Sequence, residues 1–167
     1  MLDIGCGVGT QHPMLYPVVG ELSGVDISRR HIELAGARNP GVTYTTYDGR
    51  RLPFDDGSQD VCLAVGVVHH VPVDGWPRFF AEMHRVLRQG GMGLIIEHNP
   101  RNSLTRRIVD RCPFDADAVL IDRERAEELN YRAGFDGVQS RFIMTVPSAR
   151  VFQRPVDRMF AWLPIGA

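Results

Sequence analysis

Hydrophobic and polar positions repeat along this chain with two different periods, and the two periods alternate. Short runs of apolar, β-branched and aromatic residues predict strands over residues 2–4, 22–27, 42–47, 60–68, 92–97 and 138–146. Apolar positions at helical spacing predict helices over residues 11–19, 29–37, 76–88, 104–110 and 122–133. A shorter amphipathic helix is expected in the tail that begins at Pro147. Strands that alternate with helices predict an α/β fold with a mainly parallel sheet.

Capping and stop signals support these boundaries. Ser28 and Asp122 are predicted N-caps, because their side-chain oxygens can accept hydrogen bonds from the first turn of a helix. Gly134 and the pair Gly90-Gly91 are predicted to stop helices. The continuous apolar run in the fourth predicted strand is typical of a strand that is covered on both faces.

The first strand leads into a glycine-rich loop, at the end of the sheet where parallel strands usually bind ligands. Its glycines stand at alternate positions, Gly5, Gly7 and Gly9, shortly after the acid Asp3. Glycine tolerates positive φ, so backbone N–H groups of this loop are expected to turn toward a ligand, although a purely structural turn is the alternative. The dinucleotide pattern G-x-G-x-x-G is different, because Thr10 stands in place of its third glycine. Asp3 could pair with an ammonium group and would repel a pyrophosphate.

Two more carboxylates follow the next two strands. Asp26 ends the second strand and could accept hydrogen bonds from both hydroxyls of a ribose, or it could cap the next helix. Asp48 follows the third strand and could accept a hydrogen bond from an adenine amino group, or it could be a turn residue. In the first case, the amides of Gly49 and Arg50 could meet the ring nitrogens.

A histidine pair follows the apolar fourth strand, in a segment that contains Gly66, His69 and His70. Histidine titrates near neutral pH and therefore suits a general base. Adjacent side chains point in different directions, so at most one of the two can face a substrate, and a structural hydrogen-bonding role is the alternative. No third ligand lies nearby at a suitable spacing, so no metal is expected.

These motifs together resemble those of class I S-adenosylmethionine (SAM)-dependent methyltransferases of the type that acts on small molecules. The resemblance covers roughly residues 2–146 and keeps the order of the motifs. Residues 48–60 are similar to the family's segment D-x-x-x-L-P-F-x-D-x-x-F-D, although the aromatic residue usual near that point is absent and Cys62 follows Asp60-Val61. Residues 86–91 are similar to its L-x-P-G-G turn, and residues 129–135 to its L-x-x-A-G-F helix.

The resemblance implies a Rossmann-like, doubly wound fold in one domain over residues 1–167, with about six strands in the order 3-2-1-4-5-6. It implies SAM as the cofactor. The residues expected to bind it are Asp3, Gly5, Gly7, Gly9, Asp26, Ile27, Asp48, Gly49 and Gly66. The candidates for catalysis are His69, His70 and His98. A small molecule is the expected acceptor; O-methylation is favoured, and N- or C-methylation stays open.

Members of this family usually carry an N-terminal helix over the cofactor and a seventh, antiparallel strand between strands five and six. Neither has a counterpart in this sequence, so the chain is expected to be truncated at both ends. The strand over residues 138–146 would then have an exposed edge, which could pair with a second copy to form a homodimer. Arg106, Arg107 and Arg111 could bind a carboxylate or phosphate, or form a solvated helix face.

Composition narrows the possible functions. With 44% hydrophobic residues, 23% charged residues and a net charge of −1, the chain fits a globular protein without general attraction to nucleic acid or anionic membranes. All 19 basic residues are arginines, which excludes a lysine nucleophile or base. No apolar run approaches the roughly 20 residues that span a bilayer. The three cysteines have neither disulfide nor zinc spacing, so a cytoplasmic protein is expected.

Two other functions stay open. A SAM- or nucleotide-binding module without catalysis would carry the same cofactor motifs. An NAD-dependent oxidoreductase would share the acid after the second strand, but the spacing of the glycines disfavours it.

Overall fold

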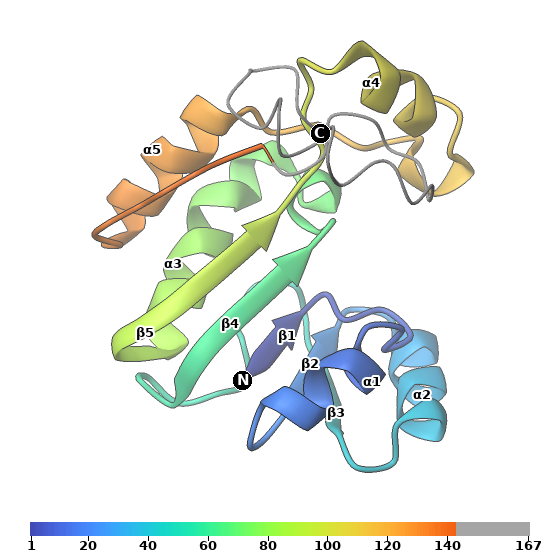
Figure 1. Cartoon of the computed structure of the whole chain (residues 1–167), viewed down its shortest axis with the longest axis vertical. Coiled ribbons are helices and arrows are strands. Elements are labelled where there is room, and N and C mark those ends of the chain that lie inside the picture. The colour runs from blue at the N-terminus through green and yellow to red at the C-terminus, as the bar shows by residue number, and fades with distance from the viewer. Residues whose placement is uncertain (143–167) are drawn as a thin grey trace. The chain divides into compact units, whose positions relative to one another are not determined.

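The structure is a computed structural model, and it describes residues 1–142 (Figure 1). The chain divides into two compact units. Unit 1 consists of Met1–Val67 and Arg78–Ile96, and unit 2 consists of Val68–Pro77 and Glu97–Ala167. The single domain expected from the sequence stays a prediction, and the two units are described in turn.

Unit 1 is built on a parallel five-stranded sheet in the order β3-β2-β1-β4-β5. Its strands are β1 (Leu2–Ile4), β2 (Ser23–Asp26), β3 (Thr43–Thr46), β4 (Gln59–Val65) and β5 (Leu87–Ile96). This order confirms the predicted Rossmann-like fold. The predicted sixth strand is not confirmed, because residues 138–142 form no strand and residues 143–146 lie outside the described residues.

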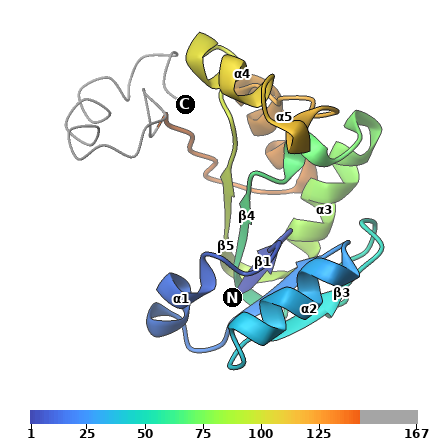
Figure 2. The same ribbon diagram turned by 90° about the vertical axis from the view of Figure 1, so that its right-hand side faces the viewer.

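Helices cover both sides of this sheet. They are α1 (His12–Leu15), α2 (Arg29–Arg38) and α3 (Trp76–Val86). Figure 2 shows α1 and α3 on opposite sides of β4 and β5. The predicted helix over residues 11–19 is shorter than expected, because it continues only as a 3₁₀ turn, Tyr16–Val18. Pro17 within that turn has no N–H to extend the α-helical hydrogen bonds.

The core of unit 1 explains the apolar run in β4. Leu2 and Ile4 of β1, and Cys62 and Ala64 of β4, are buried, as is Val25 of β2. The helix α3 contributes a buried stripe at helical spacing, made of Phe80, Met83 and Val86.

The predicted helix over residues 76–88 ends earlier than expected, at Val86. β5 pairs with β4 from Leu87 onward, with an irregular register between Gln59 and Val61. The glycine pair therefore lies inside β5 and does not stop the helix. A Cβ on Gly91 would lie 2.9 Å from the carbonyl oxygen of Arg88, so only glycine fits this turn.

Unit 2 contains the helices α4 (Ser103–Val109) and α5 (Arg123–Ala133), with 3₁₀ turns at Val68–His70, Val73–Gly75 and Pro113–Asp115. The predicted caps of α5 are confirmed: Asp122 accepts a hydrogen bond from the Arg125 amide, and Gly134 ends the helix with a φ of 103°. Trp76 Nε1 donates to the carbonyl oxygens of Val68 and Val71, both at 3.0 Å.

The tail helix expected from Pro147 lies outside the described residues. Within the described residues, no helix is long and apolar enough to cross a membrane.

One arginine of α3 fastens the loop before β4 in unit 1. Arg85 donates through Nε and Nη2 to the carboxylate of Glu82, both at 2.8 Å. Its other donors reach the carbonyl oxygens of Leu52 and Phe54 and the carboxylate of Asp56. All five N–H groups of this guanidinium therefore have a partner, and its side chain is only 17% exposed.

We predict that Arg85→Lys lowers the free energy of unfolding by about 2–4 kcal/mol, because one ammonium group cannot replace a five-donor fork. The side chain of Asp56 is 74% exposed, so Asp56→Ala should cost less than about 1 kcal/mol. Urea titration followed by circular dichroism measures both values. Equal losses in the two variants would contradict the role given to Arg85.

Candidate functional site

Unit 1 contains a cavity of about 340 Å³ at the carboxyl end of β1. The glycine loop forms much of its wall. The lining residues are Asp3, Gly5, Cys6, Gly7, Val8, Thr10, Gln11, His31 and Val65. Its volume lies at the lower end of the range of about 300–1,000 Å³ that is usual for small-molecule sites.

The amides of the glycine loop are already used within the chain. Gly5 and Cys6 donate to the carbonyl oxygen of Val25 at 2.8 and 2.9 Å, and Gly9 donates to that of Cys6 at 3.0 Å. Gly7 donates to Asp26 Oδ2 at 2.9 Å. The prediction that these N–H groups turn toward a ligand is therefore wrong for all four residues.

The glycine loop leaves room for a ligand because one of its residues has no side chain. Gly5, Gly7 and Gly9 have φ angles of 71°, 53° and 67°. A Cβ on Gly7, which lines the cavity, would meet no atom within 4 Å. A Cβ on Gly9 would lie 2.6 Å from both Asn39 Nδ2 and Tyr44 Oη. Gly7 thus leaves open space for a ligand, whereas Gly9 allows the loop to rest on side chains below it.

Asp26, at the end of β2, accepts hydrogen bonds from two backbone amides, and the N-cap of α2 is Ser28. Its Oδ1 accepts a hydrogen bond from the Ser28 amide at 2.8 Å, at the start of α2. Its Oδ2 holds the Gly7 amide, as described above. His31 Nδ1 lies 3.3 Å from Oδ1. A carboxylate has about four acceptor positions, so the two backbone bonds leave capacity for a ribose hydroxyl.

Asp3 belongs to a buried polar chain beneath the loop. Its Oδ2 lies 2.8 Å from Nε2 of His12, whose side chain is fully buried. His12 Nδ1 is hydrogen-bonded to Tyr44 Oη, which also accepts from Asn39 Nδ2 at 3.0 Å. Burial raises the pKa of Asp3, and the hydrogen bond and charge of His12 oppose that shift only in part.

Cys6 lines the same cavity. Burial, together with the nearby carboxylates of Asp3 and Asp26, raises the pKa of its thiol to about 12. The thiol is therefore neutral near physiological pH and does not act as a nucleophile.

Asp48 does not line the 340 Å³ cavity; it lines a second one of about 540 Å³. Its Oδ1 accepts from the amides of Arg51 and Arg50 at 3.0 and 2.8 Å, and these bonds lower its pKa. The Arg50 amide is therefore engaged, and the expectation that it meets a ring nitrogen is wrong. Ile27 is 68% exposed, and a Cβ on Gly49 would lie 3.4 Å from it, so these two predicted residues adjoin.

Gly66 directly follows β4 with a φ of 65° and donates its amide to the carbonyl oxygen of Ile96 at 2.8 Å. Its neighbour Val65 lines the first cavity.

In unit 2, His69 is held by a buried ion pair. Its side chain is 2% exposed, and its Nδ1 lies 2.6 Å from Oε2 of Glu97. Glu97 Oε1 accepts from the Val68 amide at 2.6 Å. Burial alone would lower the pKa of His69, but the hydrogen bond and charge of Glu97, with the charge of Asp115, raise it overall.

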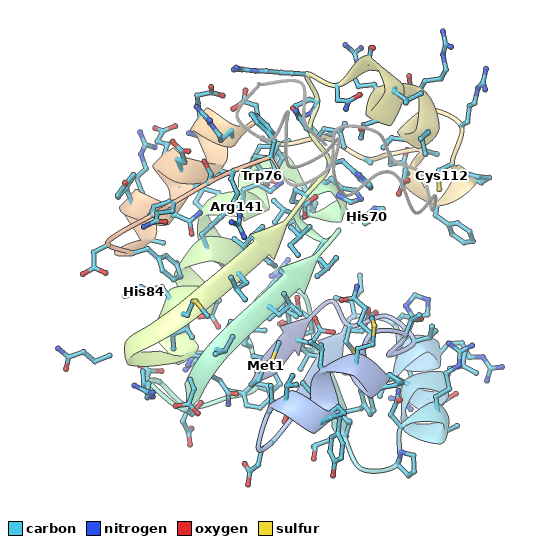
Figure 3. All side chains as sticks on the ribbon, in the orientation of Figure 1. Met1, His70, Trp76, His84, Cys112 and Arg141 are labelled. Atoms are coloured by element: carbon cyan, nitrogen blue, oxygen red, sulfur yellow. The ribbon has the colours of Figure 1, made fainter. Side chains whose placement is uncertain are left out.

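His70 is the more accessible member of the pair, with a side chain that is 46% exposed (Figure 3). Its Nε2 lies 3.4 Å from Asp115 Oδ1, and His69 Nε2 lies 3.7 Å from the same oxygen. Burial and the charge of His69 lower the pKa of His70. The ring of His98 lies 5.2 Å from that of His69, so the structure brings the three predicted histidines together.

Other residues of unit 2 have different roles. Asn99 is buried and accepts a hydrogen bond from the Arg101 amide at 2.9 Å, in a turn. Arg106, Arg107 and Arg111 are exposed on or just after α4, and anion binding by them stays a prediction.

Sequence reasoning missed several residues near the cavity of unit 1 and around the histidines of unit 2. His31 follows the N-cap Ser28 by three positions, a spacing that could have placed it beside the end of β2. His12, Glu97 and Asp115 meet their partners only through the fold, and no local signal identifies them.

Residues 2–95 match the methyltransferase domain family. Over 114 residues, the chain is 36% identical to phthiotriol/phenolphthiotriol dimycocerosates methyltransferase 1 of Mycobacterium ulcerans. That alignment covers 62% of this chain and 39% of the relative, so the chain spans about two fifths of its length.

Solved structures show the same fold. One is a SAM-dependent methyltransferase of Thermotoga maritima, described as a possible histamine N-methyltransferase (TM-score 0.67, 27% identity, 81% of this chain and 63% of that chain). Another is phosphoethanolamine N-methyltransferase 2 of Haemonchus contortus in complex with SAM (TM-score 0.68, 24% identity, 86% of this chain and 34% of that chain). At 24% identity, the second likeness shows the fold alone.

The chain therefore belongs to the methyltransferase domain family. The residues around the first cavity fit SAM, the cofactor that the sequence motifs predict. Asp3 lines the cavity. Burial disfavours its ionised form and His12 offsets that effect only in part, so the carboxylate can bind an ammonium group. Gly7 leaves space beside it, and Asp26 retains acceptor capacity.

We predict that Gly7→Ala and Gly9→Ala affect different properties. Both alanines must adopt a positive φ, at a cost of about 1–2 kcal/mol in stability. The Gly9 variant should lose more stability, because its methyl group meets Asn39 and Tyr44. The Gly7 variant should lose about tenfold or more in SAM affinity, because its methyl group enters the cavity.

Thermal unfolding and calorimetric titration with SAM measure these two effects. Gly20→Ala is the matched control, because a Cβ there meets no atom within 4 Å and Gly20 does not line the cavity. Equal behaviour of the Gly7 and Gly9 variants would show that the assignment of the loop is wrong.

We also predict that SAM affinity falls as the pH drops through the raised pKa of Asp3. The ammonium of SAM favours ionised Asp3, whereas burial favours its protonated form. Affinity is therefore complete above the raised pKa of Asp3 and falls by about tenfold per pH unit below it. Asp3→Asn should bind SAM more weakly at neutral pH and with a flatter pH profile. Asp136→Asn, in which an exposed carboxylate outside the cavity is replaced, should retain the wild-type profile.

Proposed function

We propose that this protein is a SAM-dependent methyltransferase that acts on a small-molecule acceptor. The observation that carries this proposal is the cavity of unit 1, which is lined by Asp3, the glycine loop and His31, with Asp26 beside His31 at the end of β2. Family membership supports the activity, and the alignment with the Mycobacterium ulcerans enzyme supports a small-molecule acceptor.

Each residue that the sequence predicts to bind SAM has a role in this proposal. Asp3 binds the ammonium of the methionine portion, and Asp26 accepts from the ribose hydroxyls. Ile27 and Gly49 cover the adenine, and the free oxygen of Asp48 accepts from its amino group. Gly5, Gly7, Gly9 and Gly66 let the backbone approach the cofactor closely. When bound, SAM supplies an electrophilic methyl group on a sulfonium.

For the acceptor, we propose O-methylation. Transfer to a hydroxyl releases a proton, and the accessible Nε2 of His70 is the group that takes it. His69 is a positioning residue in this scheme, because Glu97 already holds its Nδ1 in the interior. His98 completes the cluster and contacts the ring of His69.

The second candidate is a SAM-binding module without catalysis. The buried pair of His69 and Glu97 favours it, because that pair satisfies a histidine structurally and leaves it no catalytic task. Methyl transfer by the purified chain to hydroxylated acceptors separates the two candidates. An NAD-dependent oxidoreductase is the third and weakest candidate.

We further propose a cytoplasmic location, the absence of a nucleic-acid partner, and a homodimer through the edge of the sheet. The net charge of −1 supports the lack of attraction to nucleic acid. Within the described residues, β5 is an outer strand with exposed Met92, Leu94 and Ile96. Light scattering measures the oligomeric state.

We predict that Asp26→Asn weakens SAM binding by about 10- to 150-fold, a loss of about 1.5–3 kcal/mol, because an amide cannot accept at all the positions that the carboxylate fills. Calorimetric titration with SAM, S-adenosylhomocysteine and NAD measures the loss and ranks the three ligands. Asp136→Asn replaces an exposed acid and serves as the control. Unchanged SAM affinity in the Asp26 variant, or tighter binding of NAD than of SAM in the wild type, would overturn the proposed function.

A further inference from the structure

Three side chains of unit 2 bring unshared electron pairs toward one point. His69 and His70 come from the turn Val68–His70, and Asp115 comes from the turn Pro113–Asp115. One ligand atom of each lies within 4.8 Å of the other two. The distances from Asp115 Oδ1 to the Nε2 atoms of His69 and His70 are 3.7 and 3.4 Å. Both are longer than a normal N–H···O hydrogen bond of about 2.7–3.2 Å.

A fourth side chain fixes the orientation of one imidazole. Glu97 Oε2 lies 2.6 Å from His69 Nδ1, so this nitrogen carries the proton in the neutral ring. Nε2 of His69 is then left with its lone pair directed at Asp115. A carboxylate that holds the remote nitrogen of a histidine is the arrangement that orients imidazole ligands in metal sites. The Val68 amide, at 2.6 Å from Glu97 Oε1, holds the carboxylate itself in place.

We propose that His69, His70 and Asp115 bind a divalent transition-metal ion, with zinc as the ion that fits best and Glu97 as a positioning residue. A tetrahedral ion with bonds of about 2.0–2.1 Å spaces its ligand atoms about 3.3–3.4 Å apart, close to the 3.7 and 3.4 Å from Asp115 Oδ1 to the two imidazoles. Two imidazoles and one carboxylate suit zinc, whereas Mg²⁺ prefers an all-oxygen set. Three protein ligands leave one position open.

The cluster of the three ligand side chains is partly accessible to solvent and partly buried, as a metal site requires. The side chain of Asp115 is 14% exposed and that of His70 is 46% exposed, so an ion can enter from solvent. His69 closes the inner side, because its side chain is almost fully buried. The inference departs from the sequence-based expectation of no metal, which rested on the lack of a third ligand near the histidine pair.

The metal site and the proposed general base share one atom. A bound ion occupies the lone pair of His70 Nε2, and that nitrogen then cannot take a proton from an acceptor. Ion binding itself rests on residues of unit 2 alone and does not require SAM. The two proposals can therefore be tested separately on the same sample.

The test uses the full chain without an affinity tag, stripped of metal and held at slightly alkaline pH so that both imidazoles are neutral. Zn²⁺ is titrated by calorimetry, and Co²⁺ is titrated by visible absorption as a spectroscopic probe. We expect saturable binding of a single ion, with the intense d–d bands of four-coordinate Co²⁺. Titration of the same metal-free sample with SAM reports on the proposed function independently.

Five variants make the test specific. Asp115→Asn and His70→Gln should each weaken Zn²⁺ binding by more than about 100-fold, and Glu97→Gln by about 10- to 100-fold. Asp117→Asn and His84→Gln should bind as the wild type does, because both residues are exposed and lie outside the cluster (His84 and His70 are labelled in Figure 3).

Circular dichroism tests whether each variant is folded. His70→Gln replaces an accessible side chain and therefore leaves the buried interior unchanged. Wild-type affinity in both His70→Gln and Asp115→Asn would overturn the proposal, as would the absence of saturable Zn²⁺ binding by the wild-type chain. A chain that binds Zn²⁺ but not SAM would instead contradict the proposed function alone.

Discussion

The carboxylate of Asp26 is the interaction on which the cofactor site depends. One oxygen accepts from the Gly7 amide and the other from the Ser28 amide, so a single side chain joins the glycine loop to the N-cap residue of α2. This link requires a φ of 53° at Gly7, a value that residues with a Cβ seldom adopt. Because β1 and β2 pair in parallel, the loop and the carboxylate both lie at the carboxyl ends of these strands.

A buried polar chain supports this loop from below. Burial of an isolated carboxylate costs several kcal/mol, and the contact of Asp3 with His12 offsets part of that cost. Tyr44 and Asn39 extend the chain, and they occupy the space that a side chain at Gly9 would need. The loop thus rests on hydrogen-bonded side chains. His12 offsets only part of the free-energy cost of burying ionised Asp3, and a cationic ligand can offset the rest.

The sequence predicted those features that depend on neighbouring residues. The five strands of the described sheet, the caps Ser28 and Asp122 and the stop at Gly134 are confirmed, because periodicity and capping act over a few positions. Features that depend on distant segments were missed. The amides of the glycine loop bind Val25 and Asp26, and Asp115 approaches the histidine pair, through contacts that no local pattern encodes.

The histidine cluster contains more polar groups than methyl transfer needs. In-line transfer depends mainly on positioning, with at most one base. Glu97 already satisfies His69, yet Asp115 brings a second carboxylate toward both imidazoles at distances longer than hydrogen bonds. When both imidazoles are neutral, their lone pairs and the carboxylate of Asp115 repel one another in a partly buried setting, where electrostatic interactions are strong. A bound cation would replace that repulsion with coordination, which accounts for all three side chains with one interaction.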